Sequence, residues 1–367
     1  MGRTWISIAL FGCISVSAAC SRKATTQGIE PPSIPAQNEM QIKRELLQGY
    51  SLPEAAELEL VRQIQGLDAS RLQYPVSLAL SDDGDIYISD NNGDAIYHAS
   101  PSLKALNKLP AEDGRLQDPN TIQVGQNEIL ISDNDGIKIF GRNGSFQKLL
   151  RIYYAVFNFA VDSAGNIFAN PIFVTPKESD SLVVSLNKEG MRVGSFGQRL
   201  NRKEHDGLED RTYLCMVDEK VIVAFKHRPR FQIYNSKTGE LLREINVTHP
   251  VFPELAKLEQ DRNFVNPKDG VVRLPVYISG ADVTANKIYL LLALPQPEIV
   301  EFDIQGEESA RYRAKSSVSA FSYFGFRVRS VGVAHQFTLG MFNQYRDPVL
   351  MAFSSVAKTN ERKEDSK

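Results

Sequence analysis

Cysteine is scarce in this chain of 367 residues, which contains three cysteines and a single tryptophan. Two of the three, Cys13 and Cys20, lie near the start of the chain, so no network of disulfide bonds can hold the rest together. Cys215 stands in an apolar, strand-like run, and we expect it to be a small buried hydrophobic residue. The fold therefore has to rest on an apolar core.

The chain also lacks an excess of either charge and the short motifs of common enzymes. Its 42 basic and 44 acidic residues give a net charge of −2, which provides no general attraction to nucleic acid. Neither a Gly-Lys-Ser/Thr phosphate loop nor a Gly-x-Ser-x-Gly elbow is present. The histidines are scattered, with no two at the spacing of zinc ligands: His98, His205, His227, His249 and His335. A catalytic site assembled from distant residues stays open.

Beyond the first residues of the chain, no apolar run is long enough to cross a bilayer. At the start, Arg3 and the apolar run Trp5–Val16 are typical of a signal peptide, and the run is too short for a membrane span. We therefore expect a signal peptide over residues 1–19.

The segment Ser17–Cys20 resembles the lipobox of bacterial lipoproteins, in which the cysteine is acylated and becomes the first residue. The resemblance implies a lipid on Cys20, although Leu is usual where Ser17 stands. Lipidation at Cys13 and ordinary signal cleavage near Ala19 are the alternatives. The polar residues 20–45 would then form a flexible tether, and an envelope lipoprotein of the outer membrane or periplasmic face is favoured.

One sequence pattern recurs along the rest of the chain: an apolar strand, a turn rich in Asp and Gly, and a second apolar strand. It is clearest at Leu78–Asp90, where Gly84 permits the positive φ that a tight hairpin needs. A unit this short cannot bury its own apolar face, so its copies must stack on one another. After Ile86 the second strand recurs at intervals of 38 to 67 residues, close to the roughly 40–50 residues of a propeller blade, at Ile129–Asp133, Ile167–Asn170, Val221–Phe225, Ile288–Leu292 and Phe337–Met341.

Each unit closes with a second hairpin, as in Ile137–Leu150, and repeated four-stranded units of this length are typical of β-propeller blades. The last unit ends at a third strand, Val349–Phe353, and Leu58–Ile64 resembles the missing fourth strand. We therefore expect an all-β, six-bladed β-propeller of four-stranded blades over residues 46–356, closed by an N-terminal strand in the last blade. The charged segment 357–367 is expected to be disordered.

Pro75, the turn Ser81–Gly84 and the strand Ile86–Asn92 resemble the NHL repeat of six-bladed propellers. The likeness is good in the first unit and mostly topological in the fourth to sixth. The chain is also similar to a broad group of bacterial six-bladed β-propeller lipoproteins. Both resemblances imply the fold and say almost nothing about activity.

Ligands of propellers usually meet the ring face that is built from the loops between second and third strands. Acidic loops of the first two units would face a basic loop of the fourth, a pattern that suits a polar partner. The candidate ligand-binding residues are Asp90, Asn91, Asp133, Asn134, Lys226, His227, Arg228, Arg230, Tyr345 and Arg346. Alternatively, the acidic loops are ordinary turns and Lys226–Arg230 is a solvated loop. The aromatic run Phe321–Phe326 is a further candidate for this face.

The missing catalytic motifs favour a membrane-anchored binding or scaffolding protein of the bacterial cell envelope that recognises a peptide, glycan or protein. We expect a monomer with no cofactor and no nucleic-acid partner. The alternative is a calcium-dependent lactonase or hydrolase, since several six-bladed propellers are calcium lactonases. Calcium ligands would then come from Asp133, Asn158, Asp210 and Asp282. A purely structural role in envelope assembly is the third interpretation.

Overall fold

The computed structural model describes residues 45, 49–64, 72–101, 106–111, 116–152, 156–171, 181–199, 208–265, 274–315, 320, 322–331, 334–342 and 347–355. The expected signal peptide, Cys20, almost all of the tether, the charged tail and the candidates Tyr345 and Arg346 lie outside these residues. Among the described residues, no helix is both long and apolar enough to cross a bilayer.

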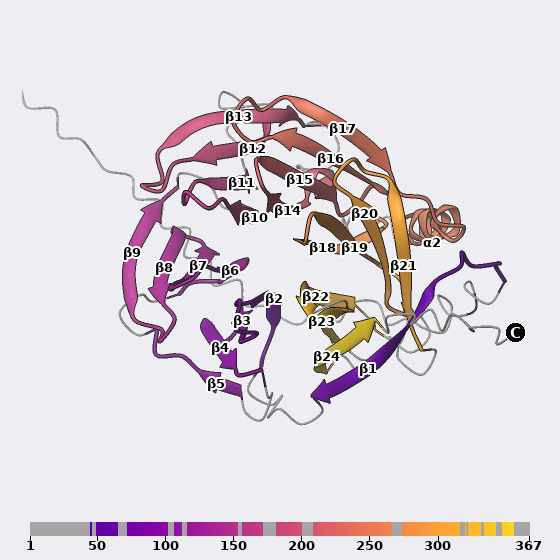
Figure 1. Cartoon of the computed structure of the whole chain (residues 1–367), viewed down its shortest axis with the longest axis horizontal. Coiled ribbons are helices and arrows are strands. Elements are labelled where there is room, and N and C mark those ends of the chain that lie inside the picture. Colours follow the sequence, from indigo (N-terminus) through magenta and orange to yellow (C-terminus); the bar gives the residue numbers. More distant parts are fainter. Residues whose placement is uncertain are drawn as a thin grey trace, which may run out of the picture.

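Four sheets of four antiparallel strands follow one another along the chain, each built from two hairpins as the repeat predicts. Gly84 has a φ of 87° in the first hairpin, which confirms its expected role. The sheets are four blades of a β-propeller, arranged around a common centre (Figure 1). Their strands are β2 (Pro75–Leu80), β3 (Ile86–Asp90), β4 (Ala95–Ala99) and β5 (Leu106–Lys108); β6 (Ile122–Val124), β7 (Glu128–Asp133), β8 (Gly136–Gly141) and β9 (Phe146–Arg151); β10 (Val156–Val161), β11 (Ile167–Pro171), β12 (Ser181–Leu186) and β13 (Arg192–Gln198); and β14 (Thr212–Val217), β15 (Lys220–Phe225), β16 (Arg230–Asn235) and β17 (Leu241–Asn246).

The rest of the ring is one sheet of eight strands, in the order β18-β19-β20-β21-β1-β24-β23-β22. Their bounds are β18 (Ile278–Thr284), β19 (Lys287–Leu292), β20 (Glu298–Asp303), β21 (Glu308–Ala314), β1 (Ala56–Ile64), β24 (Pro348–Ser355), β23 (Ala334–Phe342) and β22 (Ser322–Val331). The two edge strands, β18 and β22, contact each other. Together with β2, β6, β10 and β14 they are the innermost strands and surround the centre (Figure 1).

Strand β1 brings the two ends of the ring together. It pairs antiparallel with β24, from Leu58 opposite Ser355 to Ile64 opposite Leu350, so the expected pairing of these segments is confirmed. It also pairs in parallel with β21 over Ala56–Leu58, a contact that the sequence did not indicate. This short parallel pairing joins the last two repeats into one sheet. For that reason an eight-stranded sheet stands where two separate four-stranded blades were expected.

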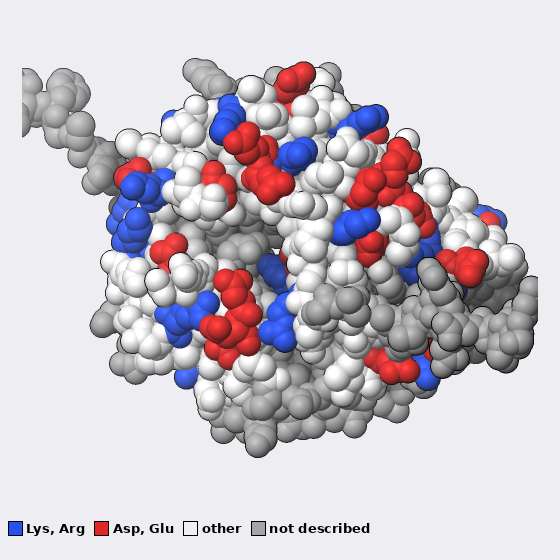
Figure 2. Space-filling view, in the orientation of Figure 1, with Lys and Arg blue, Asp and Glu red and all other residues white. Residues whose placement is uncertain are grey.

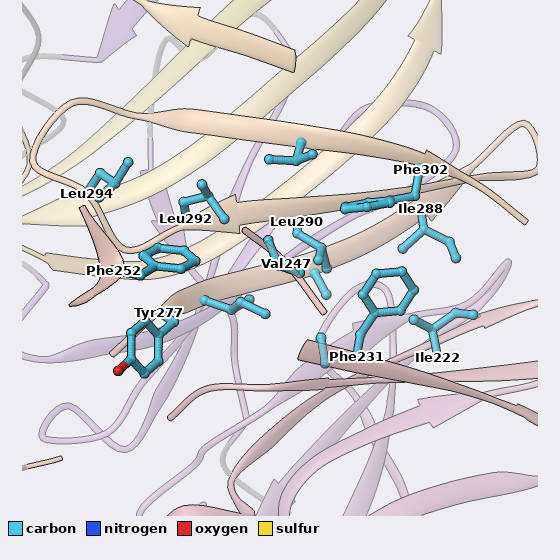
Figure 3. Packing of buried hydrophobic residues seen from close by; sticks show 14 of the residues in the cluster. Ile222, Phe231, Val247, Phe252, Tyr277, Ile288, Leu290, Leu292, Leu294 and Phe302 are labelled. Carbon is cyan, nitrogen blue, oxygen red and sulfur yellow. The ribbon is translucent and has the colours of Figure 1, made fainter. Parts of the chain in front are cut away.

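Apolar side chains fill the space between neighbouring sheets. Strand β3 is buried along its whole length because neighbouring sheets cover both of its faces. Its first three residues are apolar, and the polar side chains of Ser89 and Asp90 at its end are hydrogen-bonded. Figure 3 shows the cluster between the fourth blade and the eight-stranded sheet, where the rings of Phe231 and Phe302 meet edge to face at 5.0 Å. Helix α2 (Phe252–Val265) adds Phe252, 5.0 Å from Tyr277.

A buried carboxylate, Glu298, forms an ionic cluster in the eight-stranded sheet. It accepts hydrogen bonds from Nη1 of Arg311 at 2.8 Å and Nε of Arg313 at 2.7 Å, and lies 3.5 Å from Nε2 of His249. Burial raises the pKa of Glu298, but these partners together outweigh burial and lower the pKa to about 2. Arg313 also donates to the carbonyl of Pro53, which ties the N-terminal segment to the ring. Arg311 also pairs with Glu308 at 2.9 Å, so two carboxylates match the two arginines of this cluster.

Candidate functional site

A cavity of about 380 Å³ lies at the centre of the ring, at the level where the innermost strands begin. All six innermost strands, or the residues just before them, contribute to its wall. Figure 2 looks onto this centre and shows a hollow in which basic side chains are visible. The polar lining residues that matter most are Thr121, Asn158, Arg211, Thr212, Lys226 and Arg327.

The innermost strands are irregular at the level of the cavity. In β2, β10, β18 and β22 the pairing with the next strand skips one residue, and the skipped residues are Val76, Phe157, Ser279 and Phe324. All four line the cavity. A β-bulge turns side chains out of the regular alternation, and bulges are common beside active sites. The same kind of irregularity therefore occurs in four inner strands around a single cavity.

Two glycines let the inner strands approach closely around this cavity. A Cβ atom on Gly325 of β22 would lie 2.4 Å from Cβ of Leu78 in β2, and one on Gly280 of β18 would lie 2.6 Å from Cβ of Phe326. No side chain fits in either space, so part of the cavity wall is backbone.

Hydrogen bonds link neighbouring blades around the wall. Oγ1 of Thr121 donates to the carbonyl of Phe157 at 2.8 Å. The backbone amide of Leu214 donates to Oδ1 of Asn158, also at 2.8 Å. Because each bond joins one blade to the next, polar contacts as well as apolar packing fix the shape of the wall.

Three cationic side chains line the cavity: Arg211 just before β14, Lys226 just after β15, and Arg327 within β22. No Asp or Glu is found among the described residues of the wall. The amide of Lys226 donates to the carbonyl of Arg211 at 2.9 Å, which continues the ladder in which Thr212 pairs with Phe225. Arg211 and Lys226 therefore lie directly opposite each other on neighbouring strands, and like charges so placed are destabilising.

These two cations have no carboxylate partner within the part of the chain that the structure describes. Arg211 lies over the ring of Phe157, 4.4 Å from its centroid, and its Nε is buried without a hydrogen-bond partner. Oγ1 of Thr212, a residue only 4% exposed, is also buried and unpartnered there. Burial, followed by the charge of Arg211, lowers the pKa of Lys226 to about 8. Burial also lowers the pKa of Arg211.

Arg327 is better compensated than the other two. Its guanidinium donates to the carbonyl of Phe326 at 3.0 Å and to that of Ile122 at 3.4 Å. Asp282 is its nearby anion: burial raises the pKa of Asp282, and the charge of Arg327 opposes that rise. The carboxylate of Asp282 also accepts a hydrogen bond from the amide of Val328 at 2.7 Å. The uncompensated positive charge is therefore concentrated at the other two cations.

The acidic loop of the first blade is engaged in structural contacts. Asp90 is fully buried and accepts hydrogen bonds from the amides of Gln73 at 2.6 Å, Tyr74 at 3.0 Å and Gly93 at 2.8 Å. Asn91 donates to a carbonyl in the connection to the second blade at 3.4 Å. These contacts agree with the turn alternative, in which the side chains bond nearby amides.

The second blade repeats the arrangement. Asp133 accepts a hydrogen bond from the amide of Asp135 at 2.9 Å and forms an ion pair with Lys138 at 2.6 Å. Asn134 donates to Oδ2 of Asp118 at 2.6 Å. None of the four acidic-loop candidates lines the cavity, and their contacts hold each loop against the chain that enters the same blade or, for Asn91, the next blade.

The basic loop of the fourth blade is divided between the cavity and its surroundings. Lys226 lines the cavity. Nδ1 of His227 lies 2.9 Å from the carbonyl oxygen of Pro275, and since that oxygen can only accept, Nδ1 carries the proton. Burial lowers the pKa of His227 to about 4, with further lowering by Lys226 and Arg211, so the ring is neutral at pH 7.

The two arginines of the same loop form ion pairs outside the cavity. Arg228 pairs with Glu209 at 2.5 Å. Arg230 pairs with Glu244 at 3.3 Å and lies over the ring of Phe225, 4.7 Å from its centroid. Of the acidic-loop and basic-loop candidates in the described residues, Lys226 alone belongs to the cavity wall.

Two of the three cavity cations were missed because they stand alone in the sequence. Arg211 precedes an apolar strand, and Arg327 alternates with apolar residues inside one. Aligning the starts of the innermost strands across all repeats could have found Arg211, which directly precedes β14, but not Arg327, the sixth residue of β22. From the aromatic run 321–326, Phe324 and Phe326 do line the cavity.

The expected calcium ligands are not gathered at one place. Of Asp133, Asn158, Asp210 and Asp282, only Asn158 lines the cavity. Among the residues that the structure describes, no three His, Cys, Asp or Glu side chains form a group that could hold a metal ion. Calcium takes anionic and neutral oxygen ligands, and a wall with three cations does not fit it.

Comparison with protein-family models and with curated proteins found no match. Solved structures do match in fold. The calcium-binding protein regucalcin from Agrobacterium tumefaciens aligns with a TM-score of 0.54 and 8% identity, covering 83% of this chain and 98% of that one. A luciferin-regenerating enzyme gives a TM-score of 0.50 and 9% identity, over 78% and 93% of the two chains. Virginiamycin B lyase from Staphylococcus aureus gives 0.46 and 10%, over 82% and 99%. At these identities the likeness to the first two shows the fold alone, a β-propeller.

Proposed function

We propose that this protein is a binding protein of the bacterial cell envelope, anchored by a lipid on Cys20, which receives its ligand in the central cavity. The envelope location is supported by the signal-peptide-like run Trp5–Val16 and by the lipobox-like Ser17–Cys20. The ligand is a polar small molecule or the end of a peptide, glycan or protein partner, because the cavity is too small for more.

The polar, pre-formed cavity is the observation that carries this proposal. Its volume of about 380 Å³ is within the range of small-molecule sites, and bulges and inter-blade hydrogen bonds shape its wall. A centre that served only to hold the blades together would be more stable if apolar side chains replaced its unpaired charges. The presence of Arg211 and Lys226 at such a position favours a binding role over a purely structural one.

The ring itself is proposed to have six blades with NHL-like repeats. In this account the eight-stranded sheet counts as two blades, β18–β21 and β22–β24 with β1. The proposal is supported by the two innermost strands of that sheet, β18 and β22, which contact each other and flank the centre as the other inner strands do.

A calcium-dependent lactonase or hydrolase has less support. The name of regucalcin describes calcium binding by that protein, whereas here Arg211, Lys226 and Arg327 would repel a cation from the same place. No protein side chain of the described wall supplies a carboxylate to offset them.

Anchoring is tested by expressing the full chain and a Cys20→Ala variant in a bacterial host. The wild type is expected in the membrane fraction, with a mass that includes the acyl groups, and the variant in the soluble fraction. A variant that stays membrane-bound with an unchanged mass would remove the anchoring part of the proposal.

Ligand occupancy is tested by native mass spectrometry of protein purified from envelope extracts. Asn120 lines the cavity and is half-buried, so Asn120→Trp should fill the space. Asn107→Trp, at an exposed position of β5, is the matched control. The proposal expects a bound small molecule on the wild type and on the control, and none on the cavity variant. The same bound mass on all three proteins, or on none of them, would overturn it.

A further inference from the structure

We propose that the ligand of the central cavity carries an anionic group, a carboxylate or a phosphate, and that Arg211 and Lys226 bind this group together. The inference rests on the proposed binding function and narrows it to a chemical class. It arises from the juxtaposition of two unpaired cations with buried, unsatisfied donors on one wall of a small polar cavity.

The first argument is the register of β14 and β15. Arg211 and Lys226 occupy opposite positions on neighbouring strands, with the backbone bond between them at 2.9 Å. Cross-strand neighbours have their side chains on the same face of the sheet, where two like charges repel each other. An anion between them would convert this repulsion into two charge-assisted hydrogen bonds.

The second argument is the set of donors that the fold leaves unused. Seven buried side-chain atoms lack a partner in the described part of the molecule, and two of them, Nε of Arg211 and Oγ1 of Thr212, belong to residues of this wall. Buried polar atoms are almost always hydrogen-bonded in native proteins, and exceptions point to an absent ligand or water. Guanidinium, ammonium and hydroxyl groups share the ability to donate, so the missing partner is an acceptor rich in oxygen.

The third argument is a comparison with the other basic residues of the same blade. Arg228 and Arg230 each have a carboxylate partner, Glu209 and Glu244, although all four cations are similarly half-buried. The groups that face Lys226 are Arg211, the neutral ring of His227 and, beyond it, the paired Glu209. The fold thus neutralises the outer cations of this blade and leaves the inner pair positive.

Phe157 holds Arg211 in place without occupying its hydrogen-bond donors. Its ring lies beneath the guanidinium of Arg211, 4.4 Å from ring centroid to Cζ. A cation–π contact stabilises the charge and holds the side chain in place while it leaves the N–H groups free to bind a ligand. The bulge that places Phe157 at the wall therefore also helps to position the cation.

The experiment measures thermal unfolding of the purified protein with malonate, phosphate and the neutral analogue malonamide, at constant ionic strength. A ligand that binds the folded state raises the unfolding temperature. Malonate or phosphate is expected to raise it and malonamide is not. Glucuronate and a short peptide with a free terminal carboxylate are tested in the same way. The one that raises the unfolding temperature more shows whether the site prefers a sugar acid or a chain end.

Four variants assign the effect to the cavity. Lys226→Met and Arg211→Gln are expected to weaken anion binding at least tenfold, while Lys237→Met and Arg243→Gln, exposed positions of the same blade, keep it. The inference is overturned if no anion up to 50 mM has an effect, or if the cavity variants respond like the wild type. A cavity ligand in the mass spectra that is neutral and survives Lys226→Met would overturn the anionic class and leave the binding function standing. If the spectra show no cavity ligand, both fail.

Discussion

The amide of Lys226 donates a hydrogen bond to the carbonyl of Arg211 at 2.9 Å, and this bond holds two cations opposite each other on the cavity wall. The bond extends the β14–β15 ladder by one residue pair beyond Thr212 and Phe225. The backbone therefore fixes the spacing of the two cations, which cannot separate without breaking the ladder. Strained or unpaired groups of this kind lower stability and are kept where function needs them.

Removing the charge of Lys226 is expected to stabilise the protein. Lys226→Met should raise the free energy of unfolding at pH 7 by on the order of 1–3 kcal/mol, because a half-buried charge without a partner disappears. The pKa of Lys226 is about 8 in the folded state against 10.5 in the unfolded chain. Between these values the unfolded chain binds more protons, so wild-type stability rises with pH and the advantage of the variant shrinks. Urea unfolding at pH 7 and pH 10 measures this difference.

Lys237 provides the control for this prediction. Its side chain is 70% exposed and pairs with Glu219 at the surface of the same blade. Lys237→Met should change the free energy of unfolding by less than about 0.5 kcal/mol at either pH. A Lys226→Met protein that is less stable than the wild type at pH 7 would show that the charge is compensated after all.

His227 is expected to make the fold sensitive to acid. Its pKa is about 4 in the folded state against 6.5 in the unfolded chain, so in that window the unfolded chain binds more protons. The stability from neutral His227 is complete above pH 6.5 and is lost as the pH falls through 4. His227→Asn keeps a donor for the carbonyl of Pro275 and should remove on the order of 1–2 kcal/mol of this acid dependence. Urea unfolding from pH 4 to pH 7 checks it, and identical pH profiles would contradict it.

Removing the charge of Glu298 should lower the free energy of unfolding, whereas removing that of Lys226 should raise it. Glu298→Gln removes the buried carboxylate that Arg311 and Arg313 share. Arg311 is buried and keeps Glu308 as a partner, and Arg313 is half-buried, so the substitution is expected to cost about 3–5 kcal/mol of unfolding free energy. Glu307→Gln, at an exposed position of the same sheet, should be close to neutral. Denaturant unfolding of both variants at pH 7 is the measurement. Equal stability of the two would mean that the cluster contributes little.

The role of β1 in closing the ring is tested by substituting two of its leucines. Leu58 is fully buried against the eight-stranded sheet, whereas Leu60, two residues later, is 41% exposed. Leu58→Ala should destabilise the protein by about 2–5 kcal/mol, as large-to-small core substitutions do. Leu60→Ala should cost less than about 1 kcal/mol. If thermal unfolding shows the same loss for both, β1 does not close the ring as described.

The propeller could be predicted from the sequence because its information is local and repeated. Each hairpin is encoded by apolar alternation and by turn residues such as Gly84, and the spare strand Leu58–Ile64 could be matched to the incomplete last unit. The parallel contact of Ala56–Leu58 with β21 could not be predicted. It depends on how the chain ends meet in space, and no residue pattern marks it.

The site was predicted only in part, for a related reason. Lys226 was a candidate because it stands in a local cluster of charges, and it does line the cavity. Arg211 and Arg327 lie far apart in sequence and come together only when the ring closes. The carboxylate of Asp90 is used by backbone amides, which a sequence cannot distinguish from a free one. The bulges at the cavity also have no clear sequence signal.

The pKa of the Lys226 ammonium group, followed by NMR in isotopically labelled protein and assigned with Lys226→Gln, tests the central claim most directly. An unpaired cation beside Arg211 in the cavity should titrate near pH 8 and shift to higher pH when malonate or phosphate binds. A pKa at the ordinary lysine value of about 10.5, unmoved by either anion, would contradict the account.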